Sequence, residues 1–156
     1  RAAEGWSLPK GASRIDEATI AISNETELSS ATGGAGIGKA RLEELSLEGS
    51  LERGSVCALY AVARGSTARS VQIDAASSVD LKTQALVLDH SWTACTAGVS
   101  HLSFTGTGSG PMGTRMELGA AGLLRSDRTP DAKELSPTFG WSFVRNAPIA
   151  SCADAL

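Results

Sequence analysis

The sequence predicts an all-β protein, an antiparallel two-sheet sandwich of seven or eight short strands. Short apolar runs with two-residue alternation recur along the chain and are separated by loops rich in polar residues and glycine. No long stretch shows the 3.6-residue apolar period of an amphipathic helix. Aromatic residues make up only 4% of the 156 residues, so the core must be built from Ala, Val, Leu and Ile. Such a core suits thin, closely stacked layers.

The N-terminal part begins with a polar arm and continues with two predicted strands. Residues 1–14 are polar and are interrupted by two glycines and a proline. Ile15–Ser23 is the first strand, because Ile20 and Ile22 share one face. A second strand is expected over Glu44–Glu48, where leucines alternate with polar residues.

The apolar run Val56–Ala63 is predicted to be a strand covered on both sides, because both of its alternating faces are apolar. A helix is the competing interpretation of so short a run, and the bounding residues Gly54 and Gly65 favour the strand. A further short extended segment begins at Val71–Ile73.

The second half of the chain carries four more predicted strands before Pro148 ends the pattern: Asp80–Asp89, Val99–Thr105, Arg115–Leu124 and Phe139–Val144. Gly106–Gly113 and Ser126–Ser136 are read as loops. We therefore divide the chain into an arm (1–14), a β-sandwich domain (15–150) and a C-terminal tail (151–156).

Charge and cysteine content narrow the possible partners. The net charge of −3 argues against a folded domain that grips nucleic acid through a basic face. The three cysteines, Cys57, Cys95 and Cys152, show no CxxC spacing, which argues against a zinc site and permits at most one internal disulfide. A reducing compartment is the simpler interpretation, and a secreted protein with one bridge and one free thiol is the alternative. No apolar run is long enough to span a membrane.

Gly33–Lys39 has the G-x-x-x-x-G-K spacing of a phosphate-binding loop. Ala40 follows Lys39, so the hydroxyl that should hold magnesium is missing, and the preceding Asn24–Thr32 is polar where an apolar strand should stand. A surface loop between two strands is therefore favoured.

The remaining candidates for chemistry are weak. Asp89-His90-Ser91 suggests a hydrolytic trio, but neighbours on a strand point to opposite faces and no G-x-S-x-G elbow is present. Cys57 is read as a small core residue. Glu43–Glu44, and Asp127 with Asp131, lack a calcium-loop pattern. A possible RNA-contacting set is interleaved with carboxylates: Arg125, Arg128 and Lys133. We predict no catalytic, cofactor-binding or metal site.

The order of these segments resembles the coat-protein jelly roll of small icosahedral positive-strand RNA plant viruses, most of all the tymovirus group. The resemblance is carried by Ala40–Leu81, with its strands and polar break, and more weakly by Arg115–Leu124 and Phe139–Pro148. It implies an eight-stranded jelly roll whose copies self-assemble into a closed shell around RNA, without enzymatic activity. It places the protein in the virion and, during assembly, in the host cytoplasm.

The leading hypothesis is therefore a structural, self-assembling viral capsid subunit, whose partners are copies of itself and, through weak or arm-mediated contacts, genomic RNA. One alternative is a secreted or cell-surface β-sandwich module, such as a fibre subunit or adhesin, which is extracellular. Another is a nucleotide-binding protein that uses Gly33–Lys39. A disulfide between two of the three cysteines favours the secreted module, and three free thiols favour the cytosolic shell.

Overall fold

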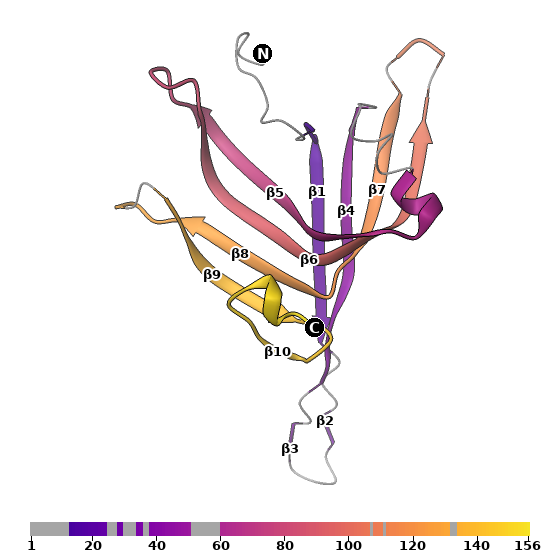
Figure 1. The fold of residues 1–156 in the computed structure, drawn as a ribbon, viewed down its shortest axis with the longest axis vertical. Coiled ribbons are helices and arrows are strands. Elements are labelled where there is room, and N and C mark those ends of the chain that lie inside the picture. The colour runs from indigo at the N-terminus through magenta and orange to yellow at the C-terminus, as the bar shows by residue number, and fades with distance from the viewer. Residues whose placement is uncertain are drawn as a thin grey trace.

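The computed structural model describes residues 13–24, 28–29, 34–35, 38–50, 60–106, 108–110, 112–131 and 134–156. These residues form an all-β fold (Figure 1). The strands, followed by one short 3-10 helix, are β1 (Glu17–Asn24), β2 (Leu28–Ser29), β3 (Gly34–Ala35), β4 (Ala40–Ser50), β5 (Thr67–Val79), β6 (Leu86–Thr105), β7 (Gly113–Gly119), β8 (Gly122–Arg128), β9 (Leu135–Ser142), β10 (Ala147–Pro148) and η1 (Cys152–Asp154).

Eight of the strands belong to one antiparallel sheet in the order β1-β4-β7-β6-β8-β9-β10, with β5 also paired to β6. The strand β6 is 20 residues long and organises the whole sheet. Its residues 86–98 pair with β5 and residues 90–95 with β8, whereas residues 98–105 pair with β7. We call β1, β4 and β7 the first arm, and β5, β8 and β9 the second arm. Figure 1 shows the two arms diverging from each other, with β5, β8 and β9 extending to the left of the view and β1, β4 and β7 running upward.

The arms separate at a break that the sequence does not reveal. Arg115–Leu124, predicted as one strand, is divided into β7, which ends at Gly119, and β8, which begins at Gly122. Across the break the backbone N–H of Ala121 donates to the carbonyl of Cys95 at 2.9 Å. The strand β7, before the break, pairs with β4 on the edge away from β6, whereas β8, after the break, pairs there with β9. The sheet therefore splits around a strand that both arms share.

The predicted two-sheet jelly roll is not confirmed, although the all-β class and the antiparallel pairing are. The structure has one curled sheet, a half-barrel, in place of two stacked sheets. One apolar cluster nevertheless joins residues of both arms: Ala40, Leu45, Ile73, Ala94, Ala97, Leu118, Leu123 and Phe143. The core therefore forms as the sheet curls on itself. The strand β6 runs through both arms and pairs with strands of each, so the two arms are joined in the same sheet.

The predicted strand over Val56–Ala63 is wrong where it can be checked. Residues 60–64 are helical, and residues 56–59 lie outside the described part of the chain. Gly65 has φ 63°, and its N–H donates to the carbonyl of Val62, while the N–H of Ser66 donates to that of Ala61. This pair of bonds is the Schellman pattern that ends helices. Gly65, taken from sequence as a strand boundary, is a helix stop, and the alanines before it have high helix propensity.

Candidate functional site

Two long strands, β1 and β5, leave an edge without a strand partner among the described residues, and so does the two-residue β10, which pairs only with β9. β1 pairs only with β4, and β5 pairs only with β6. Most side chains of the 13-residue β5 are exposed. An edge strand presents unpaired N–H and C=O groups and is a ready template for pairing with another chain. Both edges also contain a register shift, at Ala21/Ile22 in β1 and at Ala75/Ala76 in β5, a device that limits indiscriminate pairing.

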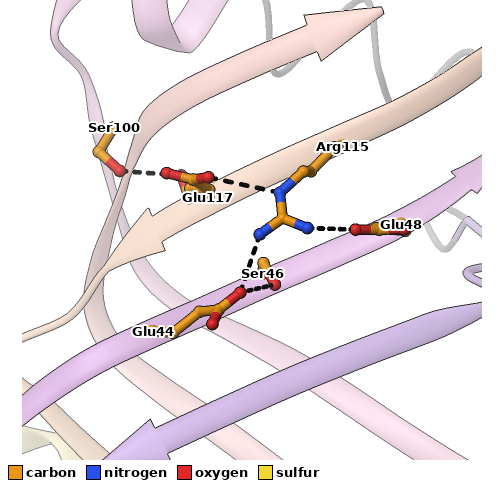
Figure 2. A network of polar contacts seen from close by, with 6 residues as sticks. All are labelled: Glu44, Ser46, Glu48, Ser100, Arg115 and Glu117. Atoms are coloured by element: carbon orange, nitrogen blue, oxygen red, sulfur yellow. Dashed lines mark hydrogen bonds and ion pairs between the residues drawn. The ribbon is translucent and has the colours of Figure 1, made fainter. Parts of the chain in front are cut away.

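The outer face of the first arm carries a network of ion pairs centred on Arg115 (Figure 2). The Nη2 of Arg115 donates to Glu44 at 2.9 Å and its Nε donates to Glu117 at 3.4 Å, while its Nη1 donates to Glu48. Glu44 also accepts a hydrogen bond from Ser46 Oγ at 2.7 Å. Strand register brings these groups together, because Glu48 lies opposite Arg115, and Ser46 opposite Glu117.

This network consists of ion pairs within the chain. The hydrogen bond with Glu48 is the largest cause that raises the pKa of Arg115, so the guanidinium stays charged. The side chains of Arg115 and its three partners are between 39% and 43% exposed, so solvent screens the pairs. Among the described residues, no group of three or more His, Cys, Asp or Glu side chains is placed to hold a metal ion.

On the core-facing side of the second arm, a row of side chains crosses β6, β8 and β9. Trp92 lies opposite Arg125, and Arg125 opposite Phe139. The Arg125 guanidinium is 5.1 Å from the centre of the Trp92 ring, and the two aromatic rings meet edge to face at 6.2 Å. Arg125 also holds Asp127 with bonds of 2.7 to 3.0 Å, and this contact, with one from Thr138, lowers the pKa of Asp127 to about 2.

The opposite face of the second arm is covered by the C-terminal segment, residues 149–156. A disulfide joins Cys95 of β6 to Cys152 of η1, with 5.1 Å between the Cα atoms. The buried hydroxyl of Ser142 donates to the carbonyl of Ala155 at 2.7 Å. The N–H of Ile149 donates to the carbonyl of Gly140 at 3.1 Å. The segment is therefore linked covalently to β6 and by hydrogen bonds to β9.

Glycines provide the space for this segment. A Cβ built on Gly140 would lie 2.0 Å from the carbonyl oxygen of Ile149. One built on Gly122 would lie 3.1 Å from both the Cβ of Ala155 and the Cδ1 of Ile149. The register row Cys95, Gly122 and Ser142 thus consists entirely of small side chains beneath the segment. Sequence reasoning missed this site, although Gly140 within the apolar strand pattern was a signal of close backbone approach.

The residues singled out from sequence are not brought together as a catalytic or nucleic-acid site. Ser91 Oγ donates to Asp74 at 2.6 Å, and Asp89 accepts from Ser77, so both have partners outside the supposed trio. The Arg128 Nε donates to the carbonyl of Leu88 at 2.6 Å. Lys133 and Cys57 lie outside the described residues.

The Gly33–Lys39 loop is described only in part. Gly34–Ala35 forms the strand β3, paired with β2. Lys39 is followed directly by the strand β4, where a phosphate-binding loop needs a helix N-terminus. The nucleotide-binding alternative is therefore unsupported. In the described part of the chain, no helix is long and apolar enough to cross a membrane.

Comparison with solved structures finds a shared fold at low sequence identity. A protein solved as "Structure of a type six secretion system protein" superimposes with a TM-score of 0.69 and 16% identity, covering 85% of this chain and 83% of that one. Hcp1 from Salmonella typhimurium superimposes with a TM-score of 0.66 and 14% identity, covering 86% of this chain and 83% of that one. A chain of the six-fold symmetrised baseplate of the anti-feeding prophage superimposes with a TM-score of 0.50 and 14% identity, covering 72% of this chain and 78% of that one. No protein-family model matches the sequence, and no curated protein matches it.

These neighbours correct the functional hypothesis drawn from sequence. The resemblance to a tymovirus-like coat protein is wrong, because the fold is that of type VI secretion proteins. The capsid function and the virion and host-cytoplasm location are withdrawn with it, and an RNA partner finds no support. Association with copies of itself, also predicted from sequence, is compatible with this fold. The disulfide also meets the criterion set for the secreted alternative.

Proposed function

We propose that this chain is a secreted structural subunit of a bacterial type VI secretion apparatus, in which copies of the chain associate edge to edge into a closed ring. The observation that carries the proposal is the shared fold, with a TM-score of 0.69 over 85% of the chain. A closed ring of six copies is suggested by the likeness to a baseplate protein solved with six-fold symmetry.

The open edges of the sheet support association between copies. β1 and β5 belong to different arms, so the two edges are distinct surfaces of one subunit. When an edge of one copy binds the other edge of the next, the contact is head-to-tail, and a ring results if the rotation closes. Such pairing would satisfy the free backbone groups of both edges.

The disulfide supports export. Disulfides persist in oxidising environments outside the cytosol and are rare within it. The Cys95–Cys152 bond therefore fits a protein that functions after leaving the cell, as the secreted alternative from sequence requires.

Native mass spectrometry and negative-stain images of the purified protein test the proposal. We expect rings, with a main species of six copies of the 16.0 kDa chain. Particles that remain monomeric at high concentration would remove the proposal.

A charge variant tests the edge itself. Ser70→Lys with Ala76→Lys places two cations on the exposed side chains of β5 and should shift the protein toward monomers. Thr129→Lys, an equally exposed change in the turn between β8 and β9, is the control and should leave the rings intact. If both variants assemble like the parent, β5 is not the contact.

A further inference from the structure

The non-covalent attachment of the C-terminal segment is small. Ala155 is its only fully buried side chain, and Ile149 and Cys152 are half-buried. The other side chains beyond Ile149 are exposed, and Leu156 is 69% exposed. Burial of one methyl group and part of an isoleucine provides little hydrophobic driving force to hold eight residues in place.

The hydrogen bonds of the segment are few and replaceable. Arg145 Nη1 donates to the carbonyl of Asp154 at 3.2 Å in an exposed contact, and Ser151 Oγ donates to Asp154 within the segment itself. The buried bond from Ser142 to Ala155 is the strongest polar contact to the sheet by distance and burial. Water can take over such bonds once the segment moves, so their net contribution is modest.

The disulfide is therefore the dominant link between the segment and the sheet, and its two cysteines differ in burial. Cys95 is fully buried, whereas Cys152 is half-buried. Because thiol–disulfide exchange needs access to a sulfur, we expect a reductant to attack the bond at the half-buried Cys152.

We propose that residues 149–156 form a redox-controlled latch, which is closed over β8 and β9 while Cys95–Cys152 is oxidised and is released when a dithiol reduces that bond. A thiolate of the dithiol attacks the Cys152 sulfur, the S–S bond breaks, and Cys95 leaves as a thiolate that takes up a proton. The second thiol then attacks the mixed disulfide, so Cys152 leaves as a thiol and the dithiol becomes a cyclic disulfide.

Release exposes a surface that the closed latch covers. The carbonyl of Gly140 loses its donor, Ile149, and the small row Cys95, Gly122 and Ser142 becomes accessible. The latch would be open in a reducing cytosol and closed in an oxidising exterior. The inference does not depend on ring formation, because every group involved belongs to one copy.

Hydrogen exchange of the full chain, oxidised or treated with dithiothreitol, tests the latch. The Cys57→Ser variant leaves only the paired cysteines, and thiol quantification reports whether the bond is broken. In the oxidised protein, the Ile149 and Ala155 amides should be protected. In the reduced protein their protection should fall by roughly tenfold or more, to that of unstructured chain, while the β8 amides remain protected. Cys152→Ser should reproduce this result without dithiothreitol.

Three results would overturn the latch. The first is that the disulfide resists dithiothreitol under native conditions. The second is that the Ile149 and Ala155 amides keep their protection from hydrogen exchange after reduction. The third is that these amides and those of β8 lose protection from hydrogen exchange together, which would mean that the disulfide stabilises the whole fold. Ring formation measured on the same samples separates this outcome from that of the proposed function.

Discussion

The two arms of the sheet share β6, but the side chains on their outer faces differ in size, charge and burial. On the first arm the row Glu48, Arg115 and Ser103 is charged and open to solvent. On the second arm the row Cys95, Gly122 and Ser142 is small, buried and covered by the C-terminal segment. The core-facing sides of both arms contribute to one apolar cluster, although Arg125 also lies on that side of the second arm.

The difference shows how a strand's outer residues depend on what lies over them. On the first arm, long charged side chains pair with one another and remain partly solvated. Where the chain returns across the face, the row beneath it consists of cysteine, glycine and serine, and an added Cβ at Gly140 or Gly122 would be crowded. We therefore expect the second arm to be far less tolerant of substitution on its outer face than the first.

Loss of the disulfide should have the largest effect. Cys152→Ser opens a loop of 57 residues, and we expect the free energy of unfolding to fall by about 2–4 kcal/mol through the greater entropy of the unfolded chain. Urea denaturation against Cys57→Ser, which keeps the bridge, measures the loss. Equal midpoints for the two variants would mean that the bridge adds no stability.

Crowding the glycine at the crossing should have the next largest effect. Gly140→Ala places a Cβ against the backbone carbonyl of Ile149, which cannot rotate away, so we expect about 1–3 kcal/mol of destabilisation. Gly119→Ala, at the end of β7 in the first arm, is the matched control, because nothing lies within 4 Å of its added Cβ. Urea denaturation compares the two variants. If they lose equal stability, close approach of the C-terminal segment is not what requires Gly140.

Local alternation was enough to predict much of the first arm, but the covered face could not be predicted. Ile20 and Leu45 were each predicted from alternation to lie in a strand, and both do, in β1 and β4. The structure adds that they pair with each other. The pairing of Cys95 with Cys152 joins residues 57 apart, and no local pattern encodes that proximity. Glycine 140 signalled close approach without saying which segment approaches.

The break between β7 and β8 was hidden for a related reason. Apolar alternation runs through Met116, Leu118 and Ala120, so the sequence indicates one strand. Both β7 and β8 pair with β6, and what changes at the break is the outer neighbour. Which strand lies beside β7 or β8 is decided by tertiary structure and leaves no local signal in the sequence. For this reason the sequence predicted a two-sheet sandwich where the structure has one curled sheet.

The ion pair of the second arm should make stability depend on acid. The pKa of Asp127 is lowered from 3.8 to about 2, chiefly by Arg125. The folded state therefore stabilises the ionised carboxylate relative to the unfolded chain. Its contribution is complete above about pH 4 and is lost as the pH falls toward 2. Asp127→Asn should therefore be less stable than the parent at neutral pH, with the gap closing between pH 4 and 2. Urea denaturation across this range, with Asp131→Asn as an exposed control, measures the gap. A gap that is constant with pH would contradict the assignment.

The smallest effect is expected at Arg115, because its pairs are exposed and screened. Arg115→Met leaves Glu44, Glu48 and Glu117 facing one another without a cation. Their repulsion should lower the stability by less than Gly140→Ala does, and added salt should remove most of the loss. Urea denaturation at low and at high ionic strength tests this.

Glu44→Gln is the matched change, since it removes one carboxylate and leaves Arg115 with two partners. Combined with Arg115→Met, it should recover part of the stability at low salt, because fewer like charges remain on the face. A loss for Arg115→Met that is unaffected by salt would mean that the side chain acts through packing of its aliphatic stem. In that case the first arm would rely on close contacts at its outer face, as the second arm does beneath its C-terminal segment.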